Sequence, residues 1–98
     1  MSVVSVLELH VLPGREEAFA RRFCELAVFE RSRESGGFLG GRLLRPLGQG
    51  STFVVVAEWD SPGDYQAWLA SALRAQLAAE LEPMLTGAPA AGRLFEEA

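Results

Sequence analysis

Residues 52–60, Thr-Phe-Val-Val-Val-Ala-Glu-Trp-Asp, are the strongest strand pattern in the chain, because β-branched and aromatic residues fill them. Residues 38–45 predict a second strand, and the short turn between the two strands predicts an antiparallel hairpin. Gly40 and Gly41 weaken this second strand and indicate a bulge or a close approach of another backbone. The centre of the fold is therefore expected to be a β-hairpin.

Two helices and two further strands are expected outside this hairpin. The strands are expected over residues 3–11 and 93–96, and the helices over 15–35 and 61–83. Gly36-Gly37 ends the first helix and Ser61 caps the second, and residues 87–92 form a small-residue loop before the last strand. The order β-α-β-β-α-β predicts an α+β, ferredoxin-like split βαβ fold, with four antiparallel strands and both helices on one face. Residues 1–98 are expected to form a single domain.

The face of the sheet away from the helices carries four valines that no helix would cover. They are Val4, Val6, Val54 and Val56. Leaving apolar surface in water is unfavourable by about 25 cal/mol per Å². A second copy of the chain, packed sheet to sheet about a twofold axis, would bury both patches. We therefore expect a homodimer.

The composition argues against several classes of function. The net charge is −4 and no basic stretch interleaves with aromatic residues, so we expect no nucleic-acid binding. The chain has no lysine, which Schiff-base and P-loop chemistry require, and its one cysteine can build neither an internal disulfide nor a zinc site. No apolar run approaches the roughly 20 residues that span a bilayer, and the first residues lack the pattern of a secretory signal. We expect a cytoplasmic protein that binds neither a membrane nor a metal.

Four short motifs, in their order and spacing, resemble the antibiotic biosynthesis monooxygenase family of dimeric α+β barrel proteins. They are Leu12-Pro13-Gly14-Arg15-Glu16-Glu17-Ala18-Phe19, Gly37-Phe38-Leu39-Gly40, Ala57-Glu58-Trp59-Asp60-Ser61 and Tyr65-Gln66-Ala67-Trp68. The resemblance extends over nearly the whole chain and implies a dimer with a ligand cavity between sheet and helices in each subunit. Members include cofactor-independent oxygenases of aromatic polyketides and haem-degrading oxygenases, and many have no assigned substrate.

The resemblance to the polyketide oxygenases assigns catalytic roles to two aromatic residues. Trp59 matches a Trp at the end of the third strand, and Tyr65 matches a Tyr six residues later. These oxygenases carry an Asn four residues before the Trp, where this chain has Val55. An amide can orient a phenol or enolate by donating and accepting hydrogen bonds at once, and a valine cannot.

The haem-degrading members use an Asn on the first strand, a Trp on the second helix and a haem-ligating His further along the chain. Trp68 matches the Trp, but Leu7 replaces the Asn and Ala78 stands near the place of the His. Haem iron requires an imidazole, thiolate, thioether or phenolate ligand, and the only histidine, His10, belongs to the first strand. Haem degradation is therefore not expected, and no cofactor is expected.

The main hypothesis is a cofactor-independent monooxygenase that acts on a flat aromatic or polyketide-like small molecule. The substrate would stack on Trp59 and Trp68, and Tyr65 would hydrogen-bond an oxygen atom. The other expected substrate-binding residues are Leu7, Leu9, Phe23, Val55 and Arg42.

Other interpretations of the same residues remain open. Trp59, Tyr65 and Trp68 equally suit plain core packing. A second interpretation is a non-catalytic small-molecule-binding or dimerisation module of the same fold, which has the cavity but catalyses no reaction. Val55 and Leu7 favour this interpretation, because they replace amide side chains of the related oxygenases. Isomerase or cyclase activity is a third alternative, by analogy with related barrels alone.

Polar residues on the strands offer few candidates for a base. His10 with Glu8 and Glu58 could form a base and its orienting partner, but alternation places them on the face away from the helices. Of the two arginines on the second strand, Arg42 is the better candidate to point toward the cavity and to stabilise an enolate or phenolate there, because it shares its parity with Phe38. Exposure to solvent, the more common environment of an arginine, is the alternative.

Overall fold

The computed structural model describes residues 2–87 and 92–98 of the chain. Four antiparallel strands form a single sheet with the order β2-β3-β1-β4. They are β1 (Val3–His10), β2 (Phe38–Leu44), β3 (Thr52–Trp59) and β4 (Arg93–Phe95). The expected hairpin of β2 and β3 and the two further strands, β1 and β4, are confirmed, whereas most of the loop expected over residues 87–92 lies outside the described residues.

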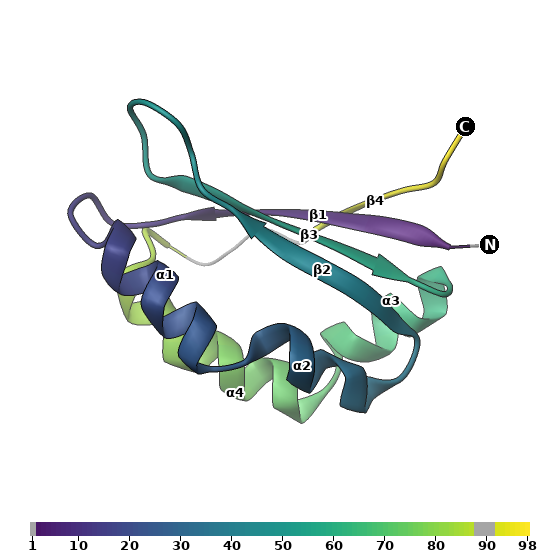
Figure 1. Ribbon diagram of the computed structural model, residues 1–98. Helices are drawn as coiled ribbons and strands as arrows, with labels where there is room; N and C mark the ends of the chain where they lie inside the picture. The colour runs from purple at the N-terminus through teal and green to yellow at the C-terminus, as the bar shows by residue number, and fades with distance from the viewer. Residues whose placement is uncertain (1, 88–91) are drawn as a thin grey trace.

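Two helical segments cover one face of the sheet and leave the other face bare (Figure 1). The first segment consists of α1 (Glu16–Glu25), α2 (Val28–Ser32) and the short 3₁₀ turn η1 (Arg33–Ser35). The second consists of α3 (Pro62–Leu69), α4 (Ala72–Leu81) and the 3₁₀ turn η2 (Glu82–Met84). This arrangement confirms the predicted ferredoxin-like α+β fold.

The first helical segment is broken at Ala27, where the sequence predicts one continuous helix. Ala27 adopts the left-handed conformation, with φ 51° and ψ 47°, which costs an alanine about 1–2 kcal/mol. The turn directs the ring of Phe29 onto that of Phe38, with centroids 6.0 Å apart and planes 9° apart, and against Phe23 at 5.4 Å. Packing of these rings outweighs the helix propensity of alanine, so the prediction of a single helix is wrong here.

The second helical segment is also two helices rather than one. Ser71 begins α4 as its N-cap, because its Oγ accepts a hydrogen bond from the backbone N–H of Arg74 at 3.1 Å. The same hydroxyl donates to the carbonyl oxygen of Trp68 at 2.8 Å, which ties the two helices together. Ala72, the first residue of α4, is exposed.

The helix ends follow the sequence signals. Ser61 caps α3 as predicted, since its Oγ accepts from the N–H of Asp64 at 3.2 Å and Pro62 occupies the first turn. Gly36 and Gly37 have φ of 84° and 72°, a conformation that glycine adopts without steric cost, and they end the first helical segment.

The two faces of the sheet differ as alternation predicts. The helix-facing side chains of β1 and β3 belong to the core: Val3, Ser5, Leu9, Phe53, Ala57 and Trp59 are buried, and Leu7 and Val55 are partly buried against it. The four valines of the bare face are only half-buried, and Glu8, His10 and Glu58 beside them are exposed.

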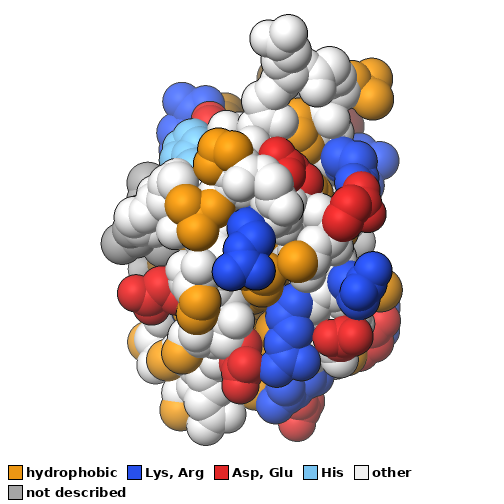
Figure 2. Space-filling model, turned by 90° about the vertical axis from the view of Figure 1, so that its left-hand side faces the viewer, with side chains coloured by type: hydrophobic (Ala, Val, Ile, Leu, Met, Phe, Trp, Pro, Cys, Tyr) orange, Lys and Arg blue, Asp and Glu red, His pale blue; other side chains and the backbone are white. Residues whose placement is uncertain are grey.

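Charged side chains are mixed on the end of the molecule that carries the β2–β3 loop. Figure 2 shows basic and acidic groups interleaved there with small hydrophobic areas, rather than gathered by sign. Two ion pairs account for part of this pattern, Arg22 with Glu80 and Arg45 with Glu17. No helix within residues 2–87 and 92–98 is long and apolar enough to cross a membrane.

Candidate active site

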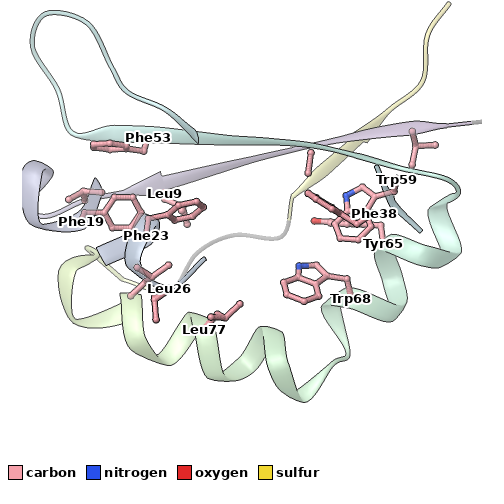
Figure 3. Close-up of a cluster of buried hydrophobic side chains, with 14 residues drawn as sticks. Leu9, Phe19, Phe23, Leu26, Phe38, Phe53, Trp59, Tyr65, Trp68 and Leu77 are labelled. Carbon is pink, nitrogen blue, oxygen red and sulfur yellow. The ribbon is translucent and has the colours of Figure 1, made fainter. Parts of the chain in front are cut away.

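A cavity of about 110 Å³ lies between the sheet and the helices. The sheet contributes Leu7, Leu9 and Val55 to its walls, and the first helical segment contributes Phe23 and Val28. Helices α3 and α4 contribute Trp68, Arg74, Leu77, Ala78 and Leu81. Figure 3 shows two groups of rings under the sheet, one around Phe23 and one around Trp59; Phe23 of the first group and Trp68 of the second line this cavity. We call it the first cavity.

A second, smaller cavity of about 60 Å³ adjoins the first, because five residues line both. The shared residues are Leu7, Val28, Val55, Trp68 and Arg74. The second cavity reaches further along the sheet to Ser5, Trp59 and Tyr65. Trp68 and Arg74 therefore stand at the junction of the two spaces.

Trp59 is held as a core residue at the end of β3. Its indole N–H donates to the Oγ of Ser5 at 3.1 Å, and that hydroxyl donates to the carbonyl oxygen of Ala57 at 3.4 Å. Its side chain is 2 % exposed. Its ring packs edge-on to Phe38, with centroids 5.2 Å apart. The buried hydrogen bond fixes the ring, which lines only the smaller cavity.

Tyr65 lies one turn into α3, and its ring packs against Trp59 with centroids 5.6 Å apart. Its phenol oxygen sits against Gly92, where even a Cβ atom would come within 2.4 Å of it. Burial raises the pKa of this phenol above its ordinary value, while the nearby Arg74 guanidinium and a hydrogen bond with the Gly92 backbone oppose the rise. Tyr65 is therefore protonated at neutral pH and acts as a hydrogen-bonding group, not as a base.

Trp68 is the aromatic residue that faces the larger space. Its ring lies 6.2 Å from that of Trp59, tilted by 31°, and it lines both cavities. Figure 3 shows its indole nitrogen directed toward the sheet. Among the described residues this N–H donates no hydrogen bond to another protein group, unlike that of Trp59.

Arg74 is the site residue that the sequence analysis missed. Among the described residues, it is the one charged side chain that lines either of these two cavities. Its position in α4 is three residues before Leu77 and seven before Leu81, on the apolar stripe that faces the sheet. An arginine on the same stripe as the apolar Leu77 and Leu81 is the signal that could have identified it.

Arg42 lies on the wrong face of the sheet for the role expected of it. A register shift between Phe38 and Gly40 places one extra residue in β2, so Arg42 pairs with Val56 and Leu43 pairs with Val55. Opposed residues share a face, so Arg42 is exposed on the bare side while Leu43 faces the helices. The prediction that Arg42 points into the cavity is wrong, because the bulge reverses the parity on which it rested.

The other sequence-predicted site residues do come together around these cavities. Leu7, Leu9, Phe23, Val55 and Trp68 line the first, and Trp59 and Tyr65 line the second. The candidates for a base do not join them, since His10 is exposed and its Nδ1 lies 2.9 Å from the hydroxyl of Thr52. Within residues 2–87 and 92–98, no cluster of three or more His, Cys, Asp or Glu side chains could hold a metal ion.

The sequence model described as "Antibiotic biosynthesis monooxygenase" matches residues 2–80, which is most of the chain. The chain belongs to the antibiotic biosynthesis monooxygenase family. The resemblance seen in the sequence motifs is thereby confirmed.

Relatives of this family member include enzymes with different reactions. A "Heme oxygenase (mycobilin-producing)" of Mycobacterium tuberculosis is 34 % identical over 89 residues, covering 90 % of this chain and 83 % of the relative. The crystal structure of SnoaB, a cofactor-independent oxygenase from Streptomyces nogalater, superposes with a TM-score of 0.79 at 24 % identity, covering 99 % of this chain and 93 % of that one. A Bordetella bronchiseptica structure that carries the family's name gives a TM-score of 0.83 at 18 % identity, covering 99 % and 97 %. These two structures share the fold.

The described residues that line the cavities do not provide the iron ligand that a haem enzyme requires. Leu77 and Ala78 occupy the stretch of α4 that faces the first cavity, and neither can ligate iron. The only side chain of a ligating type along the described walls is Tyr65, whose phenol is protonated at neutral pH and lines only the smaller cavity.

Proposed function

We propose that this family member is a cofactor-independent monooxygenase that oxidises a flat aromatic molecule bound against Trp68. Membership of the family supports oxygenase chemistry, and the apolar walls of the first cavity support an aromatic ligand. The observation that carries the proposal is the placement of Trp68, whose indole borders both cavities beside the buried phenol of Tyr65. A flat ring can stack on this indole while the phenol stands at its edge.

The size of the first cavity sets what it admits without rearrangement. An apolar cavity of about 150 Å³ takes up benzene, so a space of about 110 Å³ accommodates roughly one aromatic ring. A polycyclic substrate requires the helices to move away from the sheet. The breaks at Ala27 and Ser71, which precede α2 and α4, supply positions at which such a movement can pivot.

The reaction type explains why no cofactor would be required. When dioxygen converts an activated CH₂ group of an aromatic substrate into a carbonyl, one oxygen atom enters the product. The other leaves as water with the two displaced hydrogens, so the substrate itself supplies all the electrons. The protein has to favour the ionised substrate, position it and exclude bulk water. The hydrocarbon walls formed by Leu7, Leu9 and Val55 suit that last requirement.

The residues of the site take separate roles under this proposal. Trp68 provides the stacking surface, and Tyr65, protonated at neutral pH, donates a hydrogen bond to a substrate oxygen. Trp59 positions Tyr65 and Trp68 by packing on both rings. These assignments rest on placement in the fold.

Turnover of an anthrone with and without dioxygen tests the proposal. The wild type is expected to form the quinone in air faster than the uncatalysed reaction, and not to form it under nitrogen. Trp68→Leu is expected to reduce kcat/KM by about tenfold or more through lost stacking and positioning. Leu47→Ala, in the exposed β2–β3 loop, is the control that keeps the wild-type rate. Rates equal to the background in both atmospheres contradict the oxygenase proposal.

A second candidate is a non-catalytic module that binds small aromatic molecules. The apolar Leu7 and Val55 in the cavity wall, together with the absence of a carboxylate or imidazole along the described walls, favour it. Replacing Tyr65 with Phe separates the two candidates. An oxygenase loses turnover and keeps most of its affinity, whereas a binding module has no turnover to lose and binds the ligand more weakly.

We also propose that the chain acts as a homodimer joined through the bare face of the sheet. Cross-strand pairing sets Phe95 beside Val4, Arg42 beside Val56 and Leu44 beside Val54 on that face. Phe95 and Leu44 are 45 % and 42 % exposed, so large apolar side chains extend the area of the valines. A self-complementary strip of this kind favours a second copy of the same sheet.

A further inference from the structure

Arg74 occupies a position that folding alone does not explain. Its half-buried side chain borders two apolar cavities, where an unpaired charge is unfavourable. Arg22 pairs with Glu80, Arg45 pairs with Glu17 and Arg33 lies over the ring of Phe38, whereas several exposed arginines have no protein partner among the described residues. Arg74 differs from those exposed arginines because it lines the two cavities. Among the described residues no carboxylate pairs with the Arg74 guanidinium and no acceptor receives its hydrogen bonds.

The polar groups around Arg74 are donors. The indole N–H of Trp68, which lines both cavities together with Arg74, is directed toward the sheet (Figure 3) and has no protein acceptor among the described residues. The phenol of Tyr65 is protonated at neutral pH. The hydroxyls of Ser5 and Ser32, which line the second cavity, already donate to backbone carbonyl oxygens. A ligand in this space must therefore bring the acceptors, and a positive charge favours acceptors that are ionised.

We propose that the ligand of these cavities is an aromatic molecule with an ionised oxygen, either a carboxylate or an ionised phenol or enol, and that the Arg74 guanidinium binds this oxygen. This inference rests on the proposed aromatic cavity and names the class of molecule that it takes. The ring stacks on Trp68 on α3, and the oxygen faces Arg74 on α4, six residues further along the chain.

Arg74 also provides a positive charge that favours ionisation of the substrate, which no other described residue of the cavity walls provides. A guanidinium beside an enol or phenol stabilises the ionised form and lowers the pKa of the bound molecule. The O–H bond then breaks with its electron pair left on the substrate oxygen, and the proton passes to water. The bound substrate can ionise near neutral pH without a carboxylate or imidazole base in the cavity wall.

Benzoate and benzamide are the matched probes, because each carries a single ring and only benzoate is charged. The chain has two tryptophans, so its two indole N–H signals in a nuclear magnetic resonance spectrum report on Trp59 and Trp68 separately. In the wild type, benzoate is expected to shift the Trp68 signal and to leave that of Trp59, bonded to Ser5, nearly unchanged. Arg74→Met is expected to weaken benzoate binding by about tenfold or more and to leave benzamide binding within about twofold.

Two further variants control for charge and for folding. Arg21→Met removes the same charge from the exposed surface of α1 and is expected to bind both probes as the wild type does. Arg74→Lys keeps the charge without the planar fork and is expected to retain part of the benzoate affinity. Binding of benzamide by Arg74→Met shows that the variant keeps a folded cavity.

A phenol probe separates the two kinds of ionised oxygen. The titration midpoint of para-nitrophenol, followed by its absorption, is expected to fall on binding to the wild type and to return toward the free value with Arg74→Met. If Arg74→Met weakens benzoate binding but leaves the titration midpoint of bound para-nitrophenol unchanged, the ligands are carboxylates rather than phenols or enols.

The outcomes also distinguish this inference from the proposed function. If the wild type and Arg74→Met bind benzoate equally and both bind benzamide, the role of Arg74 is overturned while the aromatic cavity stands. If neither probe perturbs the Trp68 signal of the wild type, both proposals are overturned.

Discussion

The indole N–H of Trp59 donates a hydrogen bond to the hydroxyl of Ser5 across the paired strands β3 and β1, over 3.1 Å. Both side chains are buried, and the hydroxyl in turn donates a hydrogen bond to the carbonyl oxygen of Ala57. This chain of bonds satisfies polar groups that would otherwise be buried without partners. It fixes the ring on which Tyr65 and Trp68 pack.

Replacing Ser5 with Ala is therefore expected to destabilise the fold. The substitution leaves the Trp59 N–H buried without an acceptor, which costs about 1–3 kcal/mol of unfolding free energy. Urea unfolding followed by tryptophan fluorescence measures the loss, and Ser2→Ala, at an exposed position, is the control expected to match the wild type. In the double variant Ser5→Ala, Trp59→Phe, the effects are expected to be less than additive, because the unpaired donor is gone. If the two substitutions lower the unfolding free energy by fully additive amounts, the hydrogen bond between Trp59 and Ser5 does not contribute to stability.

The raised pKa of Tyr65 predicts a loss of stability at alkaline pH. The unfolded chain releases the phenolic proton near the ordinary pKa of 10.0, while the folded chain still holds it. Above that pH the unfolded state binds fewer protons than the folded state, so the unfolding free energy falls as the pH rises toward the folded-state pKa. Below it the two states are equally protonated at this group and the effect vanishes.

Tyr65 is the only tyrosine, so the ultraviolet titration of the phenol reports this pKa directly. The native midpoint is expected to lie above that of the chain in urea. Tyr65→Phe is expected to remove most of the alkaline decline in stability. A native midpoint at or below the unfolded one contradicts the assignment of burial as the dominant cause.

The sequence predicts the fold well where local chemistry and tertiary packing agree. Alternation along residues 3–11 and 52–60 identifies the buried face of both central strands, and Ser61 caps its helix as expected. The helix breaks are harder to predict. Ala27 has high helix propensity, and its left-handed turn serves the stacking of Phe29, a contact that no local pattern reveals.

The errors at the candidate site have two physical origins. The Gly40 and Gly41 pair indicates a bulge, but not which residue is skipped, and one residue of shift moves Arg42 to the other face. Arg74 was overlooked because charge on a helix usually means exposure. Its place on the stripe with Leu77 and Leu81 is visible in the sequence once α4 is known to begin at Ala72.

Sedimentation tests the homodimer that the bare face predicts. The wild type at micromolar concentration is expected to sediment as a species of twice the 10.6 kDa chain mass. Val56→Glu places a charge in the middle of the apolar strip and is expected to yield monomers or to weaken association by about a hundredfold or more. Ala75→Glu, exposed on α4, introduces the same charge on the covered side of the fold and is expected to stay dimeric. A folded wild-type protein at the mass of a single chain contradicts the dimer.

Haem titration tests whether this family member has the activity for which its mycobacterial relative is named. The wild type is expected to show no Soret shift typical of a ligated haem and no bleaching when a reductant is added, because Leu77 and Ala78 offer the iron no ligand. Ala78→His directs an imidazole into the first cavity and is expected to raise haem affinity with a Soret shift. Ala79→His, one residue further along α4 and exposed, is the matched control expected to behave as the wild type. Reductant-dependent bleaching of haem by the wild type would show that the cavity opens and that another side chain ligates the iron.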